Sequence, residues 1–125
     1  MFEKEGPGWR LAKDSSRGTF SVLIGGDDWA IELTNQEWEA LFFLITELVD
    51  QYKAEQNRLM DEEEITLELE RSQWWACLQG NKRQCSLKLI LKGDGEQKRG
   101  AEMYWPIPNA ESLTAAMRMM WDYSQ

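Results

Sequence analysis

Short stretches in which apolar and polar residues alternate open the chain and predict antiparallel strands. Alternation with a period of two is typical of strands that bury one face. Gly25, Gly26, Asp27 and Asp28 tolerate the backbone conformations of a hairpin turn between two such strands. We therefore expect an irregular lead over residues 1–8, followed by three strands. Their apolar positions are Trp9 and Leu11; Phe20, Val22 and Ile24; and Trp29, Ile31 and Leu33.

The period changes at Thr34, where the sequence predicts a long helix. Thr34 and Glu37 have the spacing of a capping box, in which each side chain accepts a hydrogen bond from the other residue's backbone N–H. Apolar residues then recur at steps of three and four, as they do along one face of a helix. We expect this helix to continue to about Met60. Its apolar stripe is Trp38, Leu41, Phe42, Ile45, Leu48, Val49 and Tyr52.

Strand alternation resumes after this helix and predicts a second meander. Pro106 and Pro108 end its last strand, because proline cannot donate to a sheet ladder. Asn109 is then placed to cap a closing helix. The expected elements are strands over residues 65–70, 74–79, 85–92 and 101–105, a turn at residues 80–81, a polar loop over residues 93–100 and a helix from Asn109.

This order of elements predicts an α+β fold built from two antiparallel β-meanders, each followed by a helix (βββ-α-ββββ-α). Strands and helices that occur in separate runs favour antiparallel sheets over a parallel α/β arrangement. A chain of 125 residues has the size of one domain. We expect a single domain over residues 1–125, with the lead at 1–8, the first meander and long helix at 9–60 and the second meander and short helix at 61–125.

Composition excludes most catalytic chemistry. The chain has no histidine, so Ser–His and Cys–His nucleophilic pairs cannot form within it. It also lacks the glycine-rich phosphate-binding motifs and the cysteine spacing of a zinc site. We expect no enzyme activity, no cofactor and no metal.

Cysteine usage and hydropathy indicate the setting of the protein. Cys77 and Cys85 flank the predicted turn and could face each other across the hairpin, but free thiols are the expected state. Two cysteines do not make a disulfide framework, and the first residues lack a signal-peptide pattern. No apolar run is long enough to span a bilayer. We therefore expect a cytoplasmic protein without membrane association.

Charge is strongly acidic overall and unevenly distributed. The formal net charge is −8, from 14 basic and 22 acidic residues. Residues 55–70 contain seven acids and one base, whereas residues 82–99 contain six bases and two acids. The two segments could neutralise each other on neighbouring surfaces, or the basic one could act as a local patch, because salt screens charges over about 8 Å.

Four consecutive carboxylates follow the long helix, where the helix dipole favours cations instead. One interpretation is a contact for a basic partner or a cation. The other is a solvated acidic corner, partnered by Arg71 or by the pair Lys82 and Arg83. The run lacks the glycine that a calcium loop needs. These residues are Asp61, Glu62, Glu63 and Glu64.

Aromatic residues make up 11% of the chain, more than a core of this size requires. Trp74 and Trp75 are adjacent, so they point to opposite faces of their strand. If Trp75 lies inside with Cys85 and Leu87, Trp74 lies beside lysines on the other face, an arrangement that holds single-stranded nucleic acid. The candidate nucleic-acid-binding residues are Trp74, Lys82, Arg83, Lys88, Lys92, Lys98 and Arg99. The alternative is that a second sheet or subunit covers both faces.

Five segments stand out as motifs: Gly6-Pro7-Gly8-Trp9-Arg10, the segment from Gly25 to Thr34, Leu59-Met60-Asp61-Glu62-Glu63, the segment from Ser86 to Leu91, and Ala101-Glu102 with Trp105-Pro106. Together they resemble a small family of uncharacterised cyanobacterial proteins. The family is grouped by fold with the Whirly-like single-stranded-DNA-binding transcriptional regulators. The resemblance implies that fold, but no binding residues.

The sequence alone therefore leaves two candidate functions. The first is a non-catalytic binder of single-stranded DNA or RNA with a regulatory role, which the resemblance, the basic segment and Trp74 favour. The net charge of −8 opposes it, because attraction to phosphates supplies most of the affinity in such binders. The alternative is an acidic protein–protein interaction module, which could also form a homo-oligomer.

Overall fold

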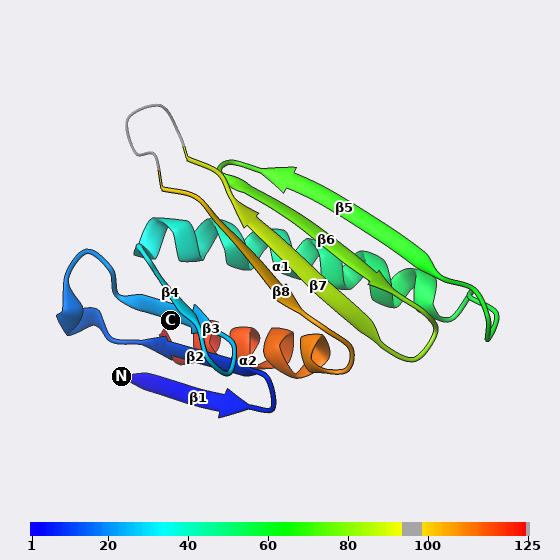
Figure 1. The fold of residues 1–125 in the computed structure, drawn as a ribbon, viewed down its shortest axis with the longest axis horizontal. Coiled ribbons are helices and arrows are strands. Elements are labelled where there is room, and N and C mark those ends of the chain that lie inside the picture. Colours follow the sequence, from blue (N-terminus) through cyan, green and yellow to red (C-terminus); the bar gives the residue numbers. More distant parts are fainter. Residues whose placement is uncertain (94–98, 125) are drawn as a thin grey trace.

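The computed structural model describes residues 1–93 and 99–124. Within them, two four-stranded antiparallel sheets and two helices form an α+β fold (Figure 1). The first sheet contains β1 (Phe2–Gly6), β2 (Trp9–Lys13), β3 (Val22–Gly25) and β4 (Ala30–Leu33), with a 3-10 turn at Ser15–Arg17. The second contains β5 (Ile65–Arg71), β6 (Trp74–Gly80), β7 (Cys85–Leu91) and β8 (Ala101–Trp105). The helices are α1 (Asn35–Gln56) and α2 (Asn109–Ser124).

The expected irregular lead over residues 1–8 is wrong, because residues 2–6 form strand β1. This strand pairs along its whole length with β2, from Phe2 opposite Lys13 to Gly6 opposite Trp9. Its sequence is largely charged because β1 is an edge strand, so pairing with one neighbour holds it without a fully buried side chain. The first half of the fold is therefore a meander of four strands, not three.

Two further boundaries differ from the sequence prediction. Phe20 lies before β3 and is 38% exposed. The helix α1 begins with the predicted capping box between Thr34 and Glu37 but ends at Gln56, before Met60. Tyr52 is its last buried residue, so no apolar contact supports the turns that would follow.

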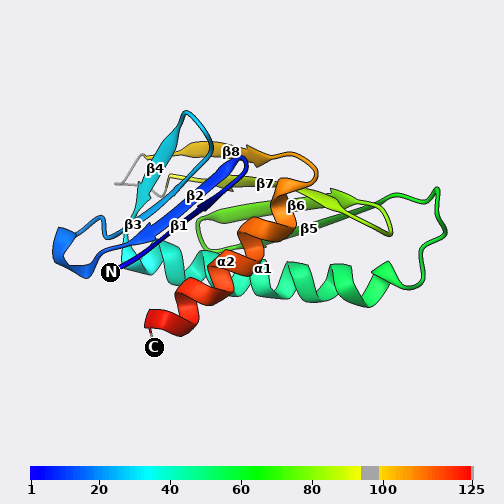
Figure 2. The same ribbon diagram turned by 90° about the horizontal axis from the view of Figure 1, so that it is seen from below.

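The second sheet has one apolar face that lies against the helices. The inward side chains of β7 are Cys85, Leu87, Leu89 and Leu91, each buried, as the alternation predicts. Helix α1 packs against β5 and β6, and α2 packs against β7 and the first sheet. Figure 2 shows α1 running along this face while α2 crosses it obliquely.

A single cluster of buried side chains joins both sheets and both helices. The indole Nε1 of Trp105 on β8 donates to the backbone oxygen of Gly25 on β3 at 3.2 Å. The same ring lies 5.4 Å from the ring of Trp29. The edge of one sheet is therefore fixed to the other by a buried polar contact and an aromatic contact.

Candidate binding surface on the second sheet

The adjacent tryptophans lie on the opposite faces from those predicted. Trp74 is 0% exposed, and its Nε1 donates to the backbone oxygen of Glu37 at 3.0 Å. It lies opposite Leu91, which places it on the apolar face, whereas Trp75 lies opposite Ile90 on the outer face. Trp74 is therefore a core residue and not part of a nucleic-acid interface.

The outer face of the second sheet is open, because no described segment packs on it. Figure 1 looks onto this face, with α1 passing behind the sheet. Tyr104 is 55% exposed, and Trp75 and Ile90 are half-buried. We call this surface the open face; the side chains that matter below are Glu68, Glu70, Trp75, Cys77, Lys88, Ile90, Glu102 and Tyr104.

Register places the aromatic residues around a lysine. Lys88 has Cys77 on one side and Tyr104 on the other in one row across the sheet. The next row across the four strands consists of Glu70, Trp75, Ile90 and Glu102. Neighbouring strands lie about 4.8 Å apart, so these side chains form one continuous surface.

This surface is not basic. Lys92, one residue beyond β7, forms an ion pair with Glu70. Glu68 and Glu102 are exposed on the same face, whereas Lys88 forms no ion pair within the described residues. Among the described residues, three carboxylates thus face two lysines, so this face lacks the excess of positive charge that binds a phosphate backbone.

The other predicted basic residues lie away from the open face or are already paired. Arg99 forms an ion pair with the buried Glu37, donates to the backbone oxygen of Glu32 and lies 4.8 Å over the ring of Phe20. Its role is to hold the start of β8 to α1. Lys98 lies outside the described residues.

Lys82 and Arg83 lie in the turn between β6 and β7, at the end of the sheet opposite to Arg99. The ammonium of Lys82 is 3.9 Å from the carboxylate of Asp61, as one interpretation of the acidic run expects. The basic segment is therefore divided between the two ends of the sheet and does not form one patch.

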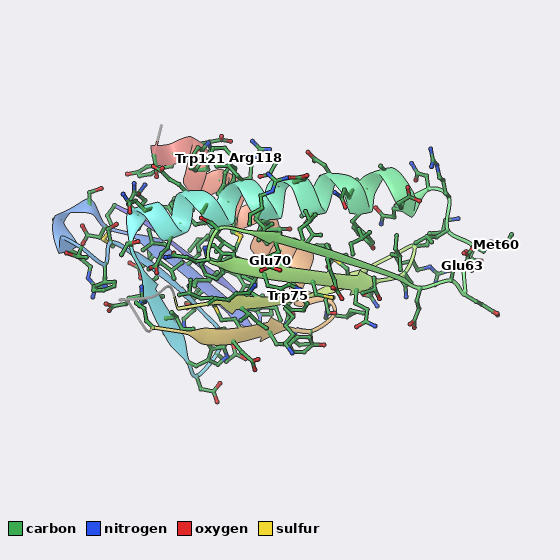
Figure 3. All side chains as sticks on the ribbon, turned by 90° about the horizontal axis from the view of Figure 1, so that it is seen from above. Met60, Glu63, Glu70, Trp75, Arg118 and Trp121 are labelled. Atoms are coloured by element: carbon green, nitrogen blue, oxygen red, sulfur yellow. The ribbon has the colours of Figure 1, made fainter. Side chains whose placement is uncertain are left out.

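The four carboxylates of the acidic run are exposed and do not surround a common point. They are Asp61, Glu62, Glu63 and Glu64. Glu63 accepts a hydrogen bond from the backbone N–H of Met60 at 2.9 Å, which closes a local turn. Figure 3 shows Glu63 and Met60 beyond the end of α1, away from Trp75. In residues 1–93 and 99–124, no group of three or more potential ligands could hold a metal ion.

The two cysteines point to opposite faces and are free thiols. Cys77 lies opposite Lys88 on the open face, and Cys85 lies opposite Gly80 on the apolar face. Burial raises the pKa of both thiols, and Glu68 adds to this for Cys77 and Glu111 for Cys85. Neither is therefore activated as a nucleophile at neutral pH.

Sequence analysis did not identify Trp75 and Tyr104 as surface residues. A signal for Trp75 was present: alternate positions from Trp74 include Ala76 and Leu78, whereas those from Trp75 include the polar Gln79. The first set is more apolar and therefore belongs inside. Tyr104 alternates with the buried Met103 and Trp105.

No helix in the described part of the chain is both long and apolar enough to cross a membrane. Residues 4–120 match the model of a protein family described as a domain of unknown function (DUF1818). No curated protein matches the chain significantly.

A solved structure from Prochlorococcus sp. NATL2A is similar over nearly the whole chain. It is described as a protein of unknown function from the DUF155 family. The two chains are 52% identical, with a TM-score of 0.91, over 97% of this chain and 99% of that one.

Proposed function

The chain belongs to the DUF1818 family, whose description assigns no activity, and we propose that it is a non-catalytic binding protein that holds a protein partner on its open face. The observation behind this proposal is the position of Trp75, Ile90 and Tyr104 on a sheet face that no described segment covers. Tryptophan and tyrosine are the side chains most enriched where protein interfaces are anchored.

The charges around these residues define the chemistry of the partner. Glu68, Glu70 and Glu102 lie beside the apolar centre, and the whole chain has a net charge of −8. Complementary potentials speed association and exclude wrong partners. The partner is therefore a protein surface with an apolar centre and a lysine- or arginine-rich rim.

The absence of histidine and the raised pKa values of both thiols support a non-catalytic function. A general base near neutral pH is most often histidine, and a cysteine nucleophile needs a lowered pKa. Burial raises the pKa of Cys77 and Cys85 instead.

The test is whether one partner depends on the open face. Proteins cross-linked to the wild-type chain in an extract are identified, purified and titrated against Tyr104→Ala and Trp75→Ala. Because interface anchors contribute 1–2 kcal/mol or more, we expect binding to weaken by about tenfold or more in each variant.

Phe43→Ala is the matched control, because Phe43 is an aromatic residue of α1 that is 57% exposed. It should leave the affinity unchanged. A partner that binds all three variants as tightly as the wild type would contradict the proposal.

Single-stranded nucleic acid is the second candidate for the same face. Tyr104 beside Lys88, with Trp75 in the next row, resembles a platform on which bases stack, each worth about 1–3 kcal/mol. The resemblance to the Whirly-like regulators favours the same occupant. The three carboxylates and the net charge oppose it.

A fluorescent mixed-sequence single strand distinguishes the two occupants. It is titrated at about 50 mM and about 150 mM salt, with Tyr104→Ala and Lys88→Glu as variants. Affinity that falls steeply with salt and is lost in both variants would assign the face to nucleic acid. We expect no measurable binding at the lower salt concentration.

A further inference from the structure

Helices α1 and α2 enclose a cavity of about 440 Å³ on the side of the second sheet away from the open face. The helices meet where the rings of Phe42 and Trp121 stack, with centroids 4.3 Å apart and planes 3° apart. From this contact the carboxyl-terminal half of α1 and the amino-terminal half of α2 diverge, as Figure 2 shows. Figure 3 labels Trp121 and Arg118 of α2 beside α1. The cavity occupies the wedge between the two helices.

The inner surface of the cavity is apolar and belongs to the core. Leu78 and Cys85 of the second sheet line it together with Ile45 of α1 and Met117 of α2. Each of these residues is at most 3% exposed, so they form the floor beneath the cavity, and the half-buried Val49 of α1 presents more apolar surface to it. A volume of 300–1,000 Å³ with such a lining is typical of small-molecule sites.

The polar groups at the inner end accept hydrogen bonds and have few protons to donate. The hydroxyl of Tyr52 donates its proton to the backbone oxygen of Asn81 at 2.6 Å, which leaves its oxygen as an acceptor. The carboxylate of Glu111 accepts from the backbone N–H of Cys85 at 2.6 Å, and this contact uses that donor. The side-chain nitrogen of Gln56 donates to the backbone oxygen of Lys82 at 2.8 Å, which leaves the amide oxygen.

Charge at the inner end is negative. Glu111 is half-buried, whereas the other charged residues that line the cavity, Asp50, Lys53 and Arg118, are exposed at its mouth. Water screens exposed charges, so the carboxylate of Glu111 dominates the interior. Burial raises the pKa values of Cys85 and Tyr52, and the negative charge of Glu111 raises them further.

We propose that this cavity binds a small organic amine, whose ammonium group pairs with Glu111 and whose apolar body lies against Val49 and the core side chains beneath it. An ammonium group offers three donors and no acceptor, which complements an inner end of acceptors. A carboxylate ligand would be repelled by Glu111, and the cations that line the cavity, Lys53 and Arg118, are exposed at its mouth. The site is separate from the open face, so this proposal stands or fails independently of the proposed function.

Phenethylamine is the probe, with phenethyl alcohol and 3-phenylpropionate as neutral and anionic counterparts of similar shape. Each is titrated into the full chain at neutral pH up to about 10 mM, with backbone amide NMR shifts as the readout. We expect saturable binding of the amine with shifts centred on α1 and α2. The alcohol and the acid should bind at least about tenfold more weakly.

Two variants place the amine in the cavity. Glu111→Gln removes the charge but keeps an acceptor for the Cys85 N–H, and should weaken amine binding by about tenfold or more. Ala115→Trp adds a large side chain at the exposed Ala115 of the lining and should abolish binding of every probe. Glu5→Gln, which makes the same charge change on the exposed edge strand β1, is the control and should bind as the wild type does.

Three outcomes would overturn the proposal. They are no saturable binding of the amine to the wild type, tighter binding of 3-phenylpropionate than of phenethylamine, and equal amine binding by wild type and Glu111→Gln. Circular dichroism spectra that match the wild type establish that each variant is folded. If Ala115→Trp does not fold, Glu111→Gln and the three probes decide the result alone.

Discussion

Trp38 has a buried indole N–H for which the described residues provide no acceptor. The other buried indole and phenol groups, those of Trp9, Trp74, Trp105 and Tyr52, are paired: Trp9 donates to Ser112 at 3.0 Å, and Tyr52 donates to Asn81 at 2.6 Å. A buried donor without a partner costs about 1–3 kcal/mol. Trp38 is nevertheless 0% exposed at the first turn of α1, so the burial of its large ring outweighs that cost.

Tyr52 predicts how the stability of the fold changes in alkali. Burial, followed by the charges of Cys85 and Glu111, raises the pKa of Tyr52 from 10.0 to about 12. Between these values the unfolded chain has released the phenolic proton and the folded chain retains it. This group therefore lowers the free energy of unfolding by about 1.4 kcal/mol for each pH unit in that interval.

Urea unfolding of the wild type and Tyr52→Phe across this pH interval tests the prediction. Near pH 8 the variant should be less stable by about 1 kcal/mol, because it lacks the hydrogen bond to Asn81. The difference should shrink as the pH rises above 10 and should change sign before 12, since only the wild type loses the contribution of the phenol, about 1.4 kcal/mol for each pH unit. A constant difference would show that the pKa of Tyr52 is not raised.

At the scale of an element, the hairpin of β6 and β7 holds both the open face and the inner wall of the cavity. Its turn is closed by the backbone N–H of Asn81, which donates to Gln84 at 3.0 Å. The side chain of Asn81 accepts from the backbone N–H of Arg83 at 2.8 Å. Gly80 lies opposite Cys85 at the start of this turn. The strands approach so closely there that the position requires glycine.

Gly80→Ala tests this close approach. A Cβ at this position would lie 2.5 Å from the backbone oxygen of Gln84 and 2.8 Å from the Cα of Cys85. Because backbone atoms cannot move aside as a side chain does, we expect the free energy of unfolding to fall by about 1–3 kcal/mol. The measurement is chemical denaturation.

Gln79→Ala is the control, because Gln79 is the exposed neighbour in the same strand. It should change the stability by no more than about 0.5 kcal/mol. If Gly80→Ala were as stable as the wild type, the hairpin could not be as tight as the structure has it.

At the scale of the whole molecule, the two sheets depend on each other. Glu37 at the start of α1 accepts from the backbone N–H of Thr34 at 2.8 Å and pairs with Arg99 ahead of β8. Its backbone oxygen accepts from Trp74 in β6. Together with the contact from Trp105 to Gly25, these bonds join the first half of the chain to the second.

We therefore predict that the chain unfolds in one cooperative transition. Far-ultraviolet circular dichroism and tryptophan fluorescence should give the same midpoint in urea. A fragment of residues 1–60 should lack stable tertiary structure, because the side chains that cover its apolar face lie in the second half. Separate midpoints, or a fragment that folds alone, would contradict this prediction.

Local patterns predicted much of the fold. The capping box of Thr34 and Glu37, the helical stripe to Tyr52 and the alternation of β7 are each decided by neighbours a few residues away. The sequence did not predict strand β1, because its side chains are little buried and the strand is held by its backbone pairing with β2. Edge strands are stabilised by backbone hydrogen bonds to another strand, which leave little signal in side-chain hydropathy.

The sequence by itself determined the types and order of most elements, the acidic net charge and the absence of histidine chemistry. Only the tertiary structure decided that Trp75 and not Trp74 faces outwards, that Arg99 is paired with Glu37, and that a cavity ends at Glu111. The hydrophobic pattern of a helix or a strand follows the repeat of its own backbone, about 3.6 or two residues, so a short segment of sequence is enough to reveal it. The face that is covered and the partner of each charge depend on residues far apart in the chain, 62 positions for Glu37 and Arg99, which meet only when the sheets pack.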